Sequence, residues 1–164
     1  TEGNSKIETN CQGENSTGVE VVTQSSVFPS EVEGLQLVST SSGEEAYALM
    51  NGYLGSEVDI KGAYIAGYRG QNVDLVFWIV EMWDEQSAVD LLEQMNSRIK
   101  KSAIFTGYEC FTDELIGQIY YARVKDDHPV FTHNYFYYKQ NKVYWVNVSG
   151  DEPLAILKKF IPSL

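Results

Sequence analysis

The sequence predicts an α+β fold, a mostly antiparallel sheet with two or three helices packed on it. Strand-like runs follow one another along the chain and are separated by short turns rather than by helices. Only two or three stretches have the helical spacing of apolar residues, too few for the strand–helix alternation of a parallel sheet. The 164 residues, of which 43% are hydrophobic, suit one domain with an ordinary core.

The clearest pattern is a hairpin that runs into a helix over residues 58–101. In residues 58–68 the larger apolar side chains share one parity, which indicates a strand. Residues 73–83 are apolar on both parities, which predicts a central strand covered on both faces. Asp84 is then placed to cap a helix, whose apolar stripe consists of Ala88, Leu91, Leu92, Met95 and Ile99.

A similar order closes the chain. Residues 130–148 form two strand-like runs around a short turn, and Asp151 then opens a helix. Both copies place an Asp-Glu pair six residues after a Trp, with Trp78 before Asp84 and Trp145 before Asp151. The pattern predicts a duplicated ββα unit. The alternative is a chance similarity between two generic hairpin-to-helix junctions.

The rest of the domain supplies shorter elements. Residues 34–38 predict a short edge strand. The sequence Ser42-Gly-Glu-Glu45 is a capping-box pattern and opens a predicted helix over residues 44–51, which should end at Gly52. Two further strands are expected within residues 104–124.

The chain divides into a leader, residues 1–26, and a single domain, residues 27–164. The leader is acidic, rich in Ser, Thr, Asn and Gly, and poor in apolar residues, which predicts a flexible segment. Because the chain begins with Thr1 rather than Met, we expect either a removed export signal or a cloned fragment. Such a leader is typical of a domain tethered at a cell surface, for example behind a lipidated residue. These features favour an extracytoplasmic protein, secreted or anchored in the cell envelope.

The charge balance excludes one class of partner. The net charge is −11, so the chain does not have the basic surface of a nucleic-acid-binding protein. No run of about 18 apolar residues, the length that a transmembrane helix needs, occurs in the sequence.

Two cysteines are present, Cys11 in the leader and Cys110 in a predicted strand. In an exported protein they could pair and close a loop of about 100 residues, which would stabilise the fold by roughly 4 to 5 kcal/mol. In a cytoplasmic protein Cys110 would instead be a buried small hydrophobe.

Several local patterns together resemble a known group of proteins. They are Phe28-Pro29, the helix start Ser42-Gly-Glu-Glu-Ala46, the hairpin that follows, and Asp84-Glu-Gln-Ser-Ala88. The combination is similar to small exported domains of uncharacterised families in prokaryotic envelope proteins, archaeal ones among them. The resemblance covers most of residues 28–101, implies an envelope location, and assigns no functional residue.

Aromatic residues are dense in the last third of the chain. Six of them are candidate ligand-binding residues: Tyr120, Tyr135, Tyr137, Tyr138, Tyr144 and Trp145. Alternation along the strands sends them to both faces, so one face can line the core while the other stays open. Exposed Tyr and Trp offer a large rigid area with a polar tip. The alternative is that these rings only fill sheet positions beneath helices.

Asp126, Asp127, His128 and His133 are the candidate metal ligands. Carboxylate and neutral imidazole could hold a divalent ion, but the two histidines are five positions apart with a Pro between them, so the spacing defines no known site. A solvated acidic turn followed by a strand histidine would give the same sequence.

The sequence contains no catalytic or phosphate-binding motif, and no catalytic residue or cofactor is assigned. The leading hypothesis is a non-enzymatic extracytoplasmic domain that binds a protein or a small ligand through its sheet aromatics. One alternative is an enzyme or metal-dependent protein that uses the region of Asp126 to His133. Another is a structural envelope module that homodimerises.

Overall fold

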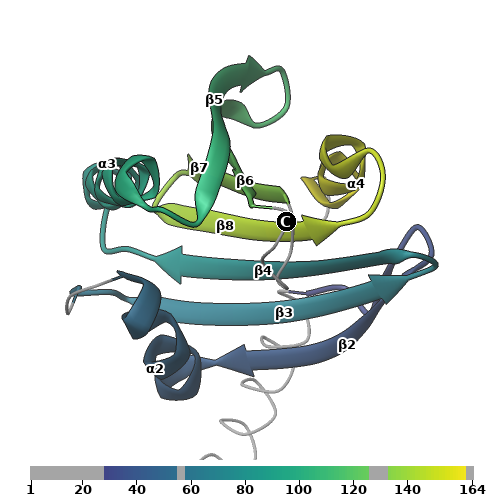
Figure 1. Cartoon of the computed structure of the whole chain (residues 1–164). Coiled ribbons are helices and arrows are strands. Elements are labelled where there is room, and N and C mark those ends of the chain that lie inside the picture. Colours follow the sequence, from purple (N-terminus) through teal and green to yellow (C-terminus); the bar gives the residue numbers. More distant parts are fainter. Residues whose placement is uncertain (1–27, 55–57, 126–132, 162–164) are drawn as a thin grey trace, which may run out of the picture.

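A computed structural model describes residues 28–54, 58–125 and 133–161 of the chain (Figure 1). These residues form one eight-stranded sheet in the order β1-β2-β3-β4-β8-β7-β6-β5, and every neighbouring pair of strands is antiparallel. Three helices of the described residues pack on the sheet. The predicted α+β fold with a mostly antiparallel sheet is therefore confirmed.

The elements have the following bounds. The strands are β1 (Glu31–Val32), β2 (Leu35–Ser42), β3 (Gly62–Gly70), β4 (Val73–Glu81), β5 (Phe105–Asp113), β6 (Gly117–Val124), β7 (His133–Lys139) and β8 (Lys142–Ser149). The helices are α2 (Gly43–Leu54), α3 (Glu85–Lys101) and α4 (Pro153–Phe160).

Several boundaries differ from the prediction; β3, for example, spans Gly62–Gly70 rather than residues 58–68. The edge strand β2 continues to Ser42, and α2 continues past Gly52, where the sequence predicted its end, to Leu54. A glycine inside a helix costs only about 1 kcal/mol relative to alanine. Burial of Ala46 and Met50 from α2 against the sheet is enough to offset that cost.

The sheet separates two hydrophobic clusters. In β4, Leu75, Phe77 and Ile79 belong to one cluster, while Val80 and Met82 belong to the other. Helix α4 packs on the first cluster, and α2 and α3 pack on the second. We name the two sides the α4 face and the α2–α3 face. The prediction of a central strand covered on both faces is borne out by β4.

Helix α3 forms as its sequence predicts. The Asp84 carboxylate accepts a hydrogen bond from the backbone N–H of Ser87 at 2.7 Å, and this bond holds the pKa of Asp84 below its usual value. The expected apolar stripe is buried, and it packs mainly on β7 and β8. Basic residues in the last turn complement the helix dipole.

The order of two strands followed by a helix occurs twice, as β3-β4-α3 and β7-β8-α4. The two hairpins meet at the centre of the sheet, where Trp78 of β4 lies directly opposite Trp145 of β8. The helices differ, because α3 lies on the α2–α3 face and α4 on the opposite face. Glu152, at the start of α4, has a left-handed backbone and gives no side-chain cap. The two units thus share their order and their hairpins but not the packing of their helices.

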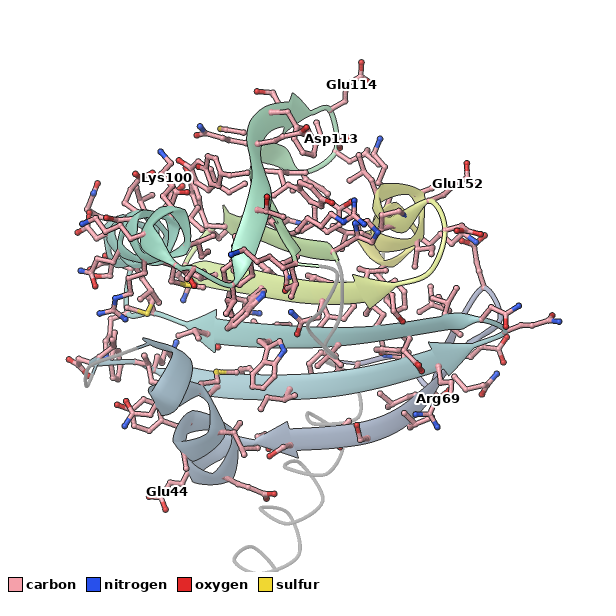
Figure 2. All side chains as sticks on the ribbon, viewed as in Figure 1. Glu44, Arg69, Lys100, Asp113, Glu114 and Glu152 are labelled. Atoms are coloured by element: carbon pink, nitrogen blue, oxygen red, sulfur yellow. The ribbon has the colours of Figure 1, made fainter. Side chains whose placement is uncertain are left out.

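An ion pair between the buried Asp113 and the partly exposed Lys158 fixes α4 to the turn between β5 and β6. Figure 2 shows Asp113 at this turn. Its carboxylate accepts hydrogen bonds from the backbone N–H groups of Leu115 and Ile116 and from Lys158 Nζ of α4 at 2.6 Å. Burial alone would raise the pKa of Asp113, but the bonds from Lys158 and the two N–H groups lower it below its usual value. The charged carboxylate is therefore the form that stabilises the fold.

We predict that Lys158→Met lowers the free energy of unfolding by about 1–2 kcal/mol near pH 7, because Asp113 loses its cationic partner. The pKa of Asp113 is lower in the folded than in the unfolded state, so this stabilisation is lost as the pH falls through the folded value. Denaturant unfolding should show the difference near pH 7 and little difference near pH 2. Lys159→Met, at the exposed neighbouring position, is the matched control and should change little. An equal loss in both variants would contradict the role of the ion pair.

Candidate functional site

The six candidate aromatic residues divide between the two faces of the sheet. Tyr135, Tyr137 and Tyr144 lie on the α4 face and are buried. On the α2–α3 face, Tyr120 is buried, whereas Tyr138 and Trp145 are partly exposed. Four of the six therefore contribute mainly to the core, and surface for a ligand is left at Tyr138 and Trp145.

Tyr137 is the most deeply buried of the four. Its ring stacks on Tyr144, with centroids 4.8 Å apart and planes 5° apart. Burial raises the pKa of the Tyr137 hydroxyl, and this hydroxyl has no hydrogen-bond partner among the described residues. An unpaired buried hydroxyl destabilises the folded state. Tyr137 thus acts through the packing of its ring.

The strongest candidate site is a pair of indoles at the centre of the α2–α3 face. Trp78 and Trp145 are cross-strand partners on β4 and β8, and both are partly exposed. Their ring centroids are 5.8 Å apart and their planes differ by 28°, a stacked arrangement. Direct cross-strand positions bring side chains of one face close together, which explains this contact.

Two buried asparagines hold the indoles in place. The Trp78 N–H donates to Asn147 Oδ1 at 2.6 Å, and Asn147 Nδ2 donates to Asn134 Oδ1 at 2.5 Å. Asn134 Oδ1 also accepts the N–H of Trp145 at 3.1 Å. Because an indole can only donate, these bonds determine the orientation of both amides. We name the set Trp78, Asn147, Asn134 and Trp145 the amide–indole ladder.

The ladder lies between the two helices of its face. Helix α2 packs on β2 and β3, whereas α3 packs mainly on β7 and β8. The asparagine side chains are almost fully buried, with 2% of Asn134 and 8% of Asn147 exposed, while the indoles above them reach the surface. None of the four side chains carries a charge. The arrangement can bind through flat apolar contact and has no group suited to acid–base or nucleophilic chemistry.

The candidate metal ligands are only partly described. Asp126, Asp127 and His128 lie outside the described residues. His133 begins β7, and its Nδ1 lies 2.7 Å from the hydroxyl of Tyr121, on which its ring stacks. Burial, and then the charge of a neighbouring arginine, lower the pKa of His133. Within the described ranges, no group of three or more His, Cys, Asp and Glu residues is placed to hold a metal ion.

Cys110 is exposed on β5, and its Sγ lies 3.3 Å from Nε2 of Gln118. The expectation that Cys110 is a buried small hydrophobe in a cytoplasmic protein is therefore wrong. The edge position of β5 leaves this side chain in solvent. Cys11 lies outside the described residues, so its pairing with Cys110 remains a prediction.

Sequence reasoning missed three members of the ladder. Trp78 was noted only as part of a predicted central strand and of the repeated unit, and neither Asn134 nor Asn147 was a candidate binding residue. One signal was available, because asparagine is depleted in strands and both asparagines fall within strand-like runs. The pairing register, which brings the four side chains together, could not be read from local patterns.

No family model matches this chain, and no curated protein matches it. Among solved structures, the extracellular domain of PknH from Mycobacterium tuberculosis has a similar fold. The TM-score is 0.51 at 9% sequence identity, over 86% of this chain and 89% of that chain. At this identity the similarity concerns the fold alone. None of the described helices is both long and apolar enough to span a membrane.

We predict that Tyr137→Phe leaves the stability unchanged or raises it, because the substitution removes a buried hydroxyl for which the described part of the chain offers no partner. The matched control is Tyr68→Phe on the same face. The hydroxyl of Tyr68 donates to the carbonyl of Pro29 at 2.8 Å, so its loss should cost about 1 kcal/mol. Thermal and denaturant unfolding measure both variants. A clear loss of stability in Tyr137→Phe would show that this hydroxyl has a partner.

Proposed function

We propose that this protein is a non-enzymatic, extracytoplasmic binding domain whose ligand contacts the indoles of Trp78 and Trp145. One observation carries the proposal: two stacked indoles, partly exposed on the α2–α3 face, are held by buried amides. The ligand is a protein segment or a small molecule. In either case we expect the part that contacts the indoles to be flat and uncharged.

The amide–indole ladder supports binding because it reduces the entropic cost of forming a complex. A surface side chain that becomes ordered on binding loses about 0.5–1.5 kcal/mol of conformational freedom. The indoles of Trp78 and Trp145 are already fixed by their N–H bonds and by their mutual stacking. Trp is also enriched among the residues that contribute most to binding energy.

Trp83 differs from Trp78 and Trp145 in how its indole is held. It is the third tryptophan of the chain, and its side chain is 62% exposed after the end of β4. Its N–H donates to the exposed carboxylate of Asp59 at 3.1 Å, and among the described residues no ring stacks on it. Trp83 is therefore exposed without being part of a preorganised surface.

Three features support an extracytoplasmic location. The fold is similar to that of an extracellular domain. The first 26 residues have the composition of a flexible leader. The patterns in residues 28–101 resemble exported prokaryotic envelope domains, and we propose that the chain is one of them. If the leader tethers the domain to the cell envelope, the indoles of Trp78 and Trp145 lie outside the membrane.

The proposal is tested by NMR of the indole N–H groups, because the chain has three tryptophans and should give three indole signals. A panel of uncharged peptides and neutral oligosaccharides serves as the set of probes. A binding probe should shift the signals of Trp78 and Trp145 and leave that of Trp83 in place. Trp145→Phe should weaken the same probe about tenfold or more, as at a binding hot spot.

Trp83→Phe is the matched control, and it should bind the probe as the unchanged protein does. Circular dichroism of each variant separates lost binding from lost fold. Probes that shift only Trp83, or that bind Trp145→Phe with unchanged affinity, would show that the indole pair is not the binding surface.

A further inference from the structure

Among the described residues, part of the outer edge of β2 has no strand beside it. Figure 1 shows β2 as the outermost of the labelled strands, with α2 beside it. The two-residue strand β1 pairs with β2 only at Gln36 and Leu35. In the described part of the chain, no strand pairs with the outer edge of β2 from Val38 to Ser42.

The backbone of Thr40 points outward from this edge. Residues of an antiparallel strand alternate between bonding to one neighbour and to the other. The N–H of Leu37 points outward, because it donates to the carbonyl of Ser30 at 2.9 Å. A bulge between Leu37 and Ser39 shifts the alternation by one residue. The next outward residue is therefore Thr40, whose N–H and C=O have no backbone partner among the described residues.

The strand β2 also differs from the other elements in its lack of charged residues. Leu35–Ser42 has no charged residue, unlike every other strand and helix in the described ranges. Val38 is 55% exposed on β2, and Leu49 is 53% exposed on the adjacent helix α2. Natural proteins usually block open edges with charged residues. The opposite edge carries an exposed charged residue, Glu109 of β5.

We propose that β2 pairs antiparallel with β2 of a second copy of this chain, across a two-fold axis near Thr40. An antiparallel strand is complementary to itself across such an axis, so each copy offers the other the same donors and acceptors. The pairing also places an uncharged strand against an uncharged strand in a chain with a net charge of −11. A cationic partner would be drawn to the acidic surfaces instead.

The ends of β2 determine how the association depends on salt. Glu31 and Glu33 lie near one end, and Glu44 and Glu45 follow the other. Antiparallel pairing brings the acidic start of one copy towards the acidic end of the other. Added salt screens this repulsion, so the dimer should become stronger as the ionic strength rises. Association with a cationic partner would show the opposite dependence.

The test is sedimentation velocity of the full chain and of two proline variants over a range of concentrations. Thr40→Pro removes the outward N–H of β2 without removing a bond to β3. The control is Thr112→Pro on β5. The Met82 N–H donates to the Asn141 carbonyl, which identifies the residues of β8 that bond to β4. The alternation of bonded residues can then be followed from β8 through β7 and β6 to β5. It places the backbone N–H and C=O of Thr112 on the outer edge of β5. Both threonines are exposed edge residues.

The mass of the unchanged protein and of Thr112→Pro should rise with concentration from 18.5 kDa towards that of two copies. Thr40→Pro should weaken this association by about tenfold or more. Circular dichroism checks that Thr40→Pro is folded, and Val38→Lys, which adds a charge at the exposed edge, should give the same result. An unchanged protein that stays monomeric, or an association that Thr40→Pro and Val38→Lys leave intact or that salt weakens, would overturn the proposal.

Discussion

The antiparallel pairing of β4 with β8 is the interaction on which the rest of the structure depends. It joins β1–β4 to β5–β8, and no other strand pair of the described residues connects these halves. Its register places Trp78 opposite Trp145. A shift of one residue would send one indole to the α4 face and separate it from its partner. Stacking of the indoles and the bonds through Asn134 and Asn147 therefore stabilise the register that creates them.

The same pairing gives the two faces different roles. On the α4 face, Phe160 of α4 packs against Tyr68 and Phe77, with ring centroids 4.7 and 5.1 Å apart, and forms a closed core. On the α2–α3 face the helices lie towards the two sides of the sheet, and the indole pair lies between them. The order of strands in the two hairpins does not by itself determine on which face of the sheet the following helix packs. Both faces carry a buried cluster, and the α2–α3 face also leaves the indoles of Trp78 and Trp145 partly exposed.

Local patterns predicted the features that local physics determines. The run at residues 73–83 indicated a strand buried on both faces, and Asp84 indicated the start of α3, because alternation and capping involve near neighbours in sequence. The candidate site needed long-range information. Tyr137 and Trp145 are equally aromatic, yet Tyr137 is buried in the cluster on which α4 packs, whereas Trp145 stays partly exposed on the α2–α3 face. Only the register of β4, β8 and β7 brings Trp78 into the same site as Asn134.

The central claim is that buried amides fix Trp78 and Trp145, and hydrogen exchange of the three indole N–H groups tests it most directly. Trp78 and Trp145 donate to buried or nearly buried oxygens, whereas Trp83 donates to the exposed carboxylate of Asp59. The account predicts slow exchange for Trp78 and Trp145 and fast exchange for Trp83. Equal, fast exchange at all three indoles would show that the ladder does not hold the pair, and would remove the physical basis of the proposed binding surface.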